Sequence, residues 1–284
     1  MKIIRFVLTF FFALGLALAI FFMFKGQTIQ VFQPEGIIAR QELNLILVNL
    51  TLMGIILIPT FVWLLSAIWK YRANNDKAQY EPEKTYGKFN QAIIWSIPSL
   101  IVLIMALHTW KETHHLDPYK RIESAEEELL IQVVALDWKW LFIYPKEAIV
   151  TVNFVQFPEK RPIRFELAAD GSPMNSFWIP QLSGQIYCMT GMVTPLHIMA
   201  DGVGMYPGRA AEINGEGYAQ MTFVAKSTTQ QDFDTWIDQV KSSPTQLNQQ
   251  LYEELLTPSI DDPIKLFSGV KNDLFEMIVM KYMP

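Results

Sequence analysis

The chain has 284 residues and a formal net charge of −5, and hydrophobic residues make up 51% of it. The mild acidic charge and the lack of any basic tract argue against nucleic acid as a partner. Cys188 is the only cysteine, which excludes an intramolecular disulfide and a cysteine-rich metal cluster. A lone thiol in an apolar run is expected to be a small buried core residue.

Three hydrophobic stretches near the N-terminus are candidate membrane spans: residues 3–24, 43–69 and 92–110. A bilayer core needs about 20 apolar residues in a helix, so the second and third stretches are predicted to span as a hairpin within residues 27–120. Pro59 and Pro98 are expected to kink these helices rather than end them, because neighbouring membrane helices satisfy the freed carbonyls.

The first stretch leaves two interpretations open for residues 1–26. Ala17-Leu18-Ala19 resembles a signal peptidase site, whereas the apolar run continues to Phe24, as in a retained helix. No cysteine follows closely, so lipoprotein processing is excluded by residue type.

The connection between the two hairpin helices is rich in basic residues. It holds Lys70, Arg72, Lys77, Lys84 and Lys88. The positive-inside rule therefore predicts a cytoplasmic connection, with everything after about residue 112 on the periplasmic or extracellular side.

Residues 126–226 change to short β-branched and aromatic runs separated by turn residues, a pattern typical of an all-β, cupredoxin-like Greek-key sandwich. The predicted strands are residues 129–135, 149–155, 163–167, 185–189, 196–200 and 218–225.

Helical periodicity follows in residues 227–284. Phe233, Trp236, Ile237 and Val240 fall at i, i+3, i+4 and i+7, as in an amphipathic helix. A second helix is predicted to begin at Ser243-Pro244, and a third covers residues 272–282. We expect these helices to pack on the sandwich or on a partner.

Three local motifs stand out, and none resembles a nucleophile elbow, a phosphate loop or a zinc motif. The first is an aromatic run at residues 137–144, with Trp138, Trp140 and Tyr144, which suits either a membrane-interface belt or a strand core. The others are residues 174–180 and 208–221. Each alone would pass for a loop with a turn.

Taken in order after a helical hairpin, these motifs resemble subunit II of the haem-copper terminal oxidases. Copper-carrying members have a histidine before Ser-Phe or Ser-Trp in the second motif, and Gly-x-Cys-x-Glu-x-Cys-Gly-x-x-His-x-x-Met in the third. Two thiolates and two imidazoles suit a soft dinuclear copper site. The copper-ligand positions here hold Asn175, Ala210, Glu212, Asn214, Tyr218 and Met221, of which only Glu212 and Met221 match the pattern.

This departure resembles the branch of cytochrome o-type ubiquinol oxidases, in which the cupredoxin fold persists without its metal. The resemblance covers nearly the whole chain from about residue 40. It implies a non-catalytic, stabilising subunit of a proton-pumping oxidase that reduces oxygen to water, in the inner membrane of a bacterium with the sandwich in the periplasm. Haems, copper and ubiquinol are then expected in subunit I, and no cofactor or metal in this chain. The expected partners are subunit I, through the hairpin, together with other oxidase subunits and membrane lipid.

Family members often carry a glutamate at the cytoplasmic start of the second hairpin helix, proposed as an entrance for protons. The matching position is Gln91, just ahead of Trp95. An amide cannot titrate, so this role is not expected here unless Glu81 or Glu83 substitutes.

The remaining polar residues have simpler interpretations. His114 and His115 are adjacent and point apart on a helix, which favours polar anchoring at the interface over metal binding. His197 alternates with apolar neighbours and is expected to face solvent or the C-terminal helices. On the first hairpin helix, Asn44, Asn49 and Thr51 are expected to contact subunit I.

Two other classes of function compete with the oxidase subunit. One is a membrane-anchored periplasmic binding module without an oxidase partner. The other is a copper-carrying electron-transfer subunit, which the missing thiolates disfavour.

Overall fold

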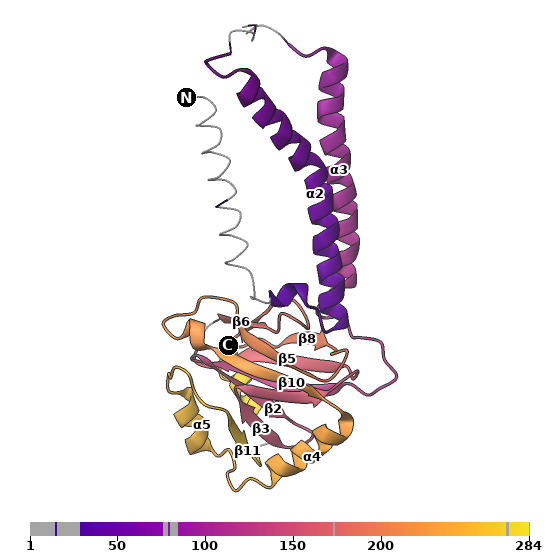
Figure 1. The fold of residues 1–284 in the computed structure, drawn as a ribbon. Helices are drawn as coiled ribbons and strands as arrows, with labels where there is room; N and C mark the ends of the chain where they lie inside the picture. The colour runs from indigo at the N-terminus through magenta and orange to yellow at the C-terminus, as the bar shows by residue number, and fades with distance from the viewer. Residues whose placement is uncertain are drawn as a thin grey trace.

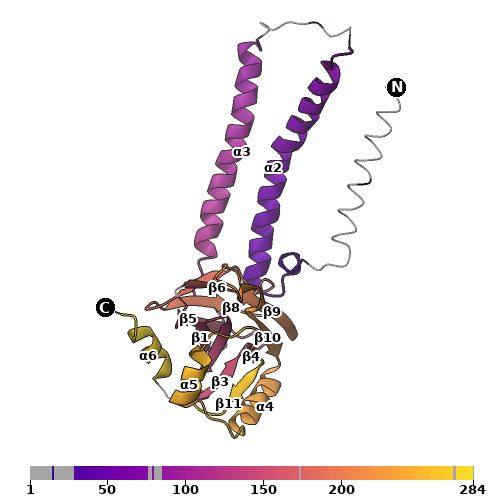
Figure 2. The ribbon, with the colours of Figure 1, turned by 90° about the vertical axis from the view of Figure 1, so that its left-hand side faces the viewer.

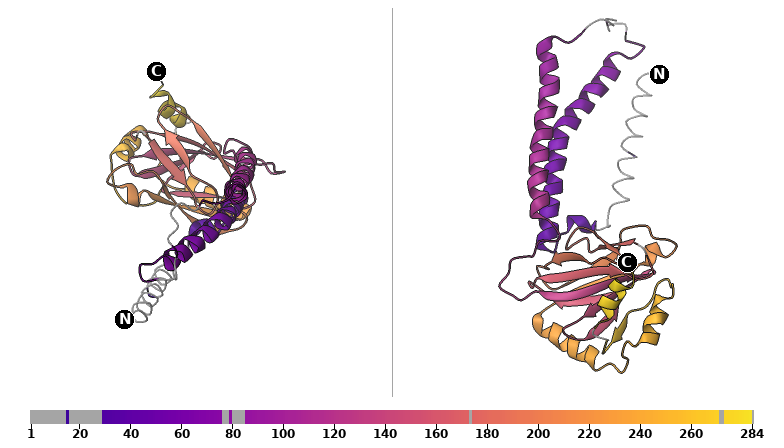
Figure 3. Two further views of the ribbon diagram at one scale, coloured as in Figure 1. Left: turned by 90° about the horizontal axis from the view of Figure 1, so that it is seen from above. Right: turned by 180° about the vertical axis from the view of Figure 1, so that it is seen from behind.

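A computed structural model describes residues 15, 29–75, 79, 85–172, 174–270 and 273–283. Two long helices stand on a β-sandwich, and the C-terminal helices lie on parts of the sandwich remote from them (Figure 1). Figure 3 shows that the helix pair rises over one side of the sandwich, not over its centre. Apart from Gly15, the N-terminal segment 1–26 lies outside the described residues.

The two helices are α2 (Ile37–Lys70) and α3 (Lys88–His115), and both are long and apolar enough to cross a membrane. They contain the two predicted spans, residues 43–69 and 92–110, and each helix extends beyond its span at both ends. Both helices continue through their internal prolines, Pro59 and Pro98. The helices lie closest near the sandwich and separate toward their far ends (Figure 2).

The predicted sandwich is confirmed, and it consists of two sheets. The first has the strand order β11-β3-β2-β1-β5-β8 and the second β4-β10-β9-β6-β7. Most neighbours are antiparallel, but β1 runs parallel to β5 and β10 parallel to β4. The strands are β1 (Leu129–Leu136), β2 (Lys139–Tyr144), β3 (Ile149–Val152), β4 (Phe154–Pro158), β5 (Ile163–Ala169), β6 (Met174–Trp178), β7 (Ile186–Met189), β8 (Thr194–Ile198), β9 (Gly204–Ala210), β10 (Thr222–Thr228) and β11 (Lys265–Phe267).

Two predicted strands are wrong in their limits. The run 149–155 is two strands in different sheets, because the chain turns at Asn153, where φ is 56°. Asparagine tolerates this left-handed conformation, and its side chain fixes it by accepting from Trp140 N at 2.9 Å and donating to Asp262 O at 2.8 Å. The run 218–225 begins with a 3-10 turn, η2 (Tyr218–Gln220), before β10.

The main core lies between the two sheets, with Phe177 of β6 in its middle. Its ring stacks on Phe223 with centroids 4.9 Å apart and meets the Trp140 ring edge-on at 5.2 Å. Cys188 is buried in the same cluster, as expected, and burial raises the pKa of its thiol. The inward-facing side chains of both sheets thus close one continuous core.

The C-terminal segment forms α4 (Gln230–Lys241), α5 (Gln249–Leu256) and α6 (Leu274–Met280). Leu247 and the buried residues of α5 and α6 join Val134, Leu136 and Leu141 in a second core on the outer face of the first sheet. The prediction that the second helix begins at Ser243-Pro244 is wrong. Backbone bonds from Leu247 N to Gly269 O and from Ser268 N to Thr245 O hold this stretch extended, and Asn248 caps α5 instead.

Candidate functional site

The copper-ligand positions come from one end of the second sheet. Asn175 lies on β6 and Ala210 ends β9, while the following loop and η2 supply the others. Two backbone bonds close this loop, from Ala210 N to Met221 O and from Ala211 N to Ser176 O, each at 2.9 Å. The fold therefore gathers residues that are far apart in the sequence.

Three of these side chains contact one another. The Asn214 amide nitrogen donates to Asn175 Oδ1 and lies 3.2 Å from Met221 Sδ. Asn175 and Met221 are fully buried. Among the described residues, the amide atoms Asn175 Nδ2 and Asn214 Oδ1 are buried without a hydrogen-bond partner, which costs free energy.

Glu212 and Tyr218 take no part in that contact. Both are partly buried, and Tyr218 packs against the main core. Within the part of the chain that the structure describes, neither the Glu212 carboxylate nor the Tyr218 hydroxyl has a hydrogen-bond or ion-pair partner. The structure thus brings Asn175, Asn214 and Met221 together and leaves these two at the margin.

The aromatic run supports the same loop. Trp138 has a φ of 60°, and its ring lies so close to Gly217 that a Cβ there would sit 2.5 Å from it. Trp140 is fully buried, with its indole nitrogen 3.4 Å from Met221 O. Trp140 and Tyr144 lie in β2, so the strand-core interpretation is confirmed and the interface belt is wrong.

Tyr144 is also fully buried, and its hydroxyl exchanges two hydrogen bonds with the backbone of Gln156. It donates to Gln156 O at 2.8 Å and accepts from Gln156 N at 2.9 Å. Burial, partly offset by the bond to Gln156, raises the pKa of the phenol. This side chain joins the two sheets and offers no group that exchanges a proton near neutral pH.

Lys139 lies between the two tryptophans and is 1% exposed. Its ammonium donates to the carbonyls of Leu255 at 3.0 Å and Thr257 at 2.8 Å, and lies 3.3 Å from the Asp262 carboxylate. A buried ammonium is tolerated only when it is paired and hydrogen-bonded in this way. Lys139 therefore anchors the C-terminal segment to the first sheet.

Asp170 anchors the same segment a second time. The fully buried carboxylate accepts from Tyr252 at 2.6 Å, Tyr282 at 2.6 Å and Lys281 at 2.7 Å. Burial by itself raises the pKa of this carboxyl, but the hydrogen bonds from Lys281, Tyr252 and Tyr282 outweigh burial and lower it.

The sandwich also holds the start of α2. Arg40 forms an ion pair with Asp201, and the Glu42 carboxylate accepts a hydrogen bond from Gly184 N at 2.9 Å. Gly36 forms an isolated antiparallel β-bridge with Ala200. A Cβ on Gly36 would lie 2.9 Å from Met199 O, so only glycine permits this approach. The base of the hairpin is thus fixed to two sandwich loops.

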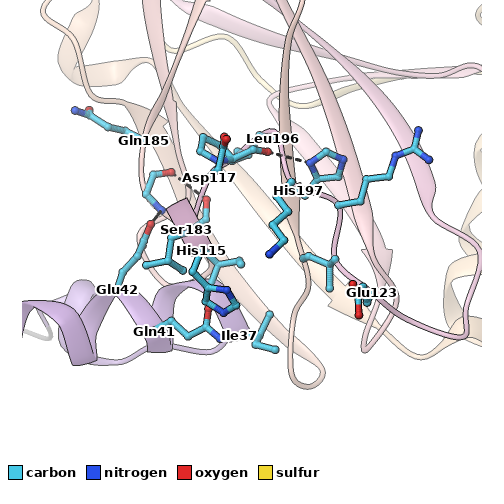
Figure 4. Close-up of a pocket in the computed structure, with 17 residues that line it drawn as sticks. Ile37, Gln41, Glu42, His115, Asp117, Glu123, Ser183, Gln185, Leu196 and His197 are labelled. Carbon is cyan, nitrogen blue, oxygen red and sulfur yellow. Dashed lines mark hydrogen bonds between the residues drawn. The ribbon is translucent and has the colours of Figure 1, made fainter. Parts of the chain in front are cut away.

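Between this base and the sandwich is a cavity of about 460 Å³ (Figure 4). His197 lines it and is buried, so the prediction that it faces solvent or the C-terminal helices is wrong. Its Nδ1 lies 2.9 Å from Pro118 O, and its Nε2 lies 3.2 Å from the Glu128 carboxylate without hydrogen-bond alignment. The segment after α3 folds back over this strand and covers the ring.

The polar residues of the hairpin make mostly local contacts. Asn49 and Thr51 donate to the carbonyls of Leu45 and Leu47, and Asn44 is exposed. Such bonds satisfy the side-chain donors without a second helix. The side-chain oxygen of Asn49, Oδ1, has no hydrogen-bond partner among the described residues.

Gln91 is exposed near the far end of the hairpin. Its amide donates to Tyr86 O at 2.9 Å. Glu81 and Glu83 lie outside the described residues.

The donors at the copper-ligand positions do not fit a dinuclear copper site. They offer two amides, a thioether, a carboxylate and a phenol, whereas soft copper sites of this kind use thiolates and imidazoles. His114 contacts Trp110, with ring centroids 4.6 Å apart. The described ranges hold no group of three or more His, Cys, Asp or Glu residues that could bind a metal.

The geometry defines a protein with two apolar helices, each long enough to cross a membrane, joined to a β-sandwich that carries these positions. A model of the COX Aromatic Rich Motif matches residues 241–284. The chain is 42% identical over 267 residues to cytochrome bo(3) ubiquinol oxidase subunit 2 of Pseudomonas aeruginosa, covering 94% of this chain and 80% of the relative. It is 40% identical over 262 residues to ubiquinol oxidase subunit 2 of Acetobacter aceti, covering 92% and 85%. The chain belongs to the ubiquinol oxidase subunit II family.

Solved structures give more distant similarities. The periplasmic domain of cytochrome oxidase subunit II of Bradyrhizobium japonicum is 18% identical, with a TM-score of 0.39, over 42% of this chain and 96% of that one. A chain of a haem-copper terminal oxidase dimer is 12% identical, with a TM-score of 0.37, over 49% and 99%.

Proposed function

We propose that this chain is the non-catalytic subunit II of a proton-pumping terminal ubiquinol oxidase that reduces oxygen to water, and that it stabilises and assembles with subunit I. The observation that carries the proposal is the contact of Asn175, Asn214 and Met221 at positions that hold copper ligands in copper-carrying relatives. Ubiquinol is lipid-soluble and delivers electrons from within the bilayer, so an outward copper relay has no substrate.

Subunit I then holds the haems, the copper and the ubiquinol site, and this chain binds none of them. A sandwich that lacks a bound metal must replace metal-binding free energy on the order of 10 kcal/mol with packing and hydrogen bonds. The core around Phe177 and the anchors at Lys139 and Asp170 are suited to that role.

The hairpin provides the surface for assembly. Most of its apolar side chains are exposed in the isolated chain, as expected of helices that face lipid or other oxidase subunits. Lys70, Arg72 and Lys88 at its far end support a cytoplasmic connection. We infer from this that the protein lies in a bacterial inner membrane, with its sandwich in the periplasm.

A metal assay tests the copper-free site. The full chain, expressed without other oxidase subunits and loaded with copper, should retain no stoichiometric copper after dialysis. The matched positive control restores the ligand set with Asn175→His, Ala210→Cys, Asn214→Cys and Tyr218→His together, and it should bind copper and absorb in the near infrared. Stoichiometric copper in the wild-type chain would overturn the proposal.

Co-purification separates the oxidase subunit from the other candidate, a binding module without an oxidase partner. A tagged full chain should bring down a haem-bearing membrane complex with ubiquinol oxidase activity. Recovery of an intact, haem-free monomer from native membranes would favour the binding module. Family membership supports the first outcome.

A further inference from the structure

An open cavity of about 800 Å³, lined by polar and charged residues, lies at the sandwich-side ends of α2 and α3. Arg40 and Asn44 of α2, Lys111, Glu112 and His115 of α3, and Lys120 of the following segment contribute to its lining. It shares Gln41, His115 and Lys120 with the cavity in Figure 4, so the two are neighbours. The site is thus built from three separate parts of the chain.

The charge of this lining favours an anion. Three basic side chains face one carboxylate, that of Glu112. Asp201 neutralises Arg40, but within the described part of the chain neither Lys111 nor Lys120 has an ion-pair partner. Two lysines with free ammonium groups are therefore available at one cavity.

The cavity lies at the depth of lipid headgroups in an inserted hairpin. Trp110, one residue before Lys111, is 70% exposed, and exposed tryptophans mark the membrane-water interface. One turn further into the membrane, Leu47 of α2 and Leu107 of α3 are also exposed. A molecule with its charged group in the cavity could therefore lay an apolar chain along the helix surface on the membrane side of the cavity.

We propose that this cavity binds the phosphodiester group of a glycerophospholipid, with Lys111 and Lys120 contacting the phosphate and the acyl chains lying along Leu47 and Leu107. A lysine ammonium binds phosphate as a point charge, and basic pockets between membrane helices suit lipid headgroups. The proposal rests on the proposed function only in taking the hairpin as membrane-spanning, and it is independent of the state of the copper-ligand positions.

The test uses the complete oxidase that contains this chain, stripped of lipid in detergent and titrated with phosphatidylglycerol while native mass spectrometry counts bound lipid. The double variant Lys111→Gln, Lys120→Gln should bind about thirtyfold more weakly, which corresponds to about 1 kcal/mol per lysine. The matched control is Lys146→Gln, Lys241→Gln, which removes one exposed lysine of the sandwich and one of α4 and should leave binding unchanged. The double variant Lys111→Arg, Lys120→Arg should retain binding.

Two further probes identify the source of the phosphate. A diacylglycerol with the same acyl chains should not bind, and millimolar inorganic phosphate should not displace phosphatidylglycerol. Equal lipid binding by the Gln variant and wild type would overturn the proposal. So would displacement by inorganic phosphate, or a wild-type complex in which another subunit fills the cavity and no lipid binds.

Discussion

The sandwich and the hairpin bury their apolar residues in opposite ways. Each strand of the sandwich directs side chains such as Ile131 and Phe165 into a core where they are fully buried. Along the described length of α2 and α3, only Ala39 and Ile101 are buried. The sandwich therefore contains its own source of folding free energy, whereas the hairpin depends on lipid or on partner subunits.

Hydrogen bonding follows the same division. The sandwich uses long-range bonds, such as those of Lys139 and Asp170, to join segments far apart in the sequence. In the hairpin, Thr51, Thr60 and Ser66 bond to carbonyls four residues earlier. Local bonds of this kind satisfy polar groups without any tertiary structure, as a membrane requires.

The largest expected effect is in the sandwich core. Phe177→Ala removes the ring at the centre of the aromatic cluster and should lower the free energy of unfolding of the sandwich by about 3–5 kcal/mol. The measurement is denaturant unfolding of the full chain in detergent, followed by near-ultraviolet circular dichroism.

Leu107→Ala is the matched change in the hairpin, because this side chain is exposed in the isolated chain. It should change sandwich unfolding by less than about 0.5 kcal/mol. If both variants destabilised the sandwich equally, Leu107 of the hairpin would contribute to the stability of the sandwich. This result would contradict the claim that the sandwich folds on its own core.

Asp170→Asn should have the next largest effect, a loss of about 2–3 kcal/mol. The variant removes the negative charge that binds Lys281 and leaves three donors around a neutral amide. Because Tyr252, Lys281 and Tyr282 belong to the C-terminal segment, limited proteolysis should also cut that segment faster. Asp238→Asn on the exposed surface of α4 is the control, and comparable losses in both variants would contradict the anchor.

Stability should fall in acid for the same reason. The folded-state pKa of Asp170 lies below its usual value, since the bonds from Lys281 and the two tyrosines outweigh burial. Its contribution is therefore complete above the unfolded pKa of about 4 and is lost as pH falls through the folded pKa. Unfolding midpoints measured from pH 7 down to pH 3 should converge for wild type and Asp170→Asn below about pH 4. Parallel curves would rule out this linkage.

Much of the fold could be predicted because its patterns are local. Hydrophobic length identified both hairpin helices, and β-branched runs identified the sandwich. β9 was missed for a local reason, because it contains Gly204, Pro207 and Gly208, which are poor strand formers. β2 remained one of two interpretations, because its aromatic residues also suit a membrane interface.

The interior polar residues could not be predicted, because their partners are distant in sequence. Lys139 is buried against Leu255 and Thr257, and His197 against Pro118. At the copper-ligand positions the sequence supplied the residue types through the family motif. That Asn214 contacts Asn175 and Met221, while Glu212 does not, depends on how the loop closes.

The smallest expected effect is at the far end of the hairpin. Gln91→Leu removes one exposed hydrogen bond, to Tyr86 O, and should change stability by less than about 0.5 kcal/mol. Because the amide does not titrate, turnover and the protons pumped per electron should also be unchanged in the oxidase reconstituted into vesicles. A fall in either quantity would show that this residue takes part in proton uptake.

Gln91→Glu is the companion variant, since it introduces the carboxylate found in other family members. If protons entered here, the new carboxylate should speed turnover, most clearly at high pH where proton supply limits the rate. We expect no acceleration, because among the described residues the Gln91 side chain hydrogen-bonds only the backbone carbonyl of Tyr86, just ahead of α3. Turnover slower than wild type would argue equally against an entrance at this position. The two variants together decide whether this end of the hairpin conducts protons or serves only to hold the helices in the membrane.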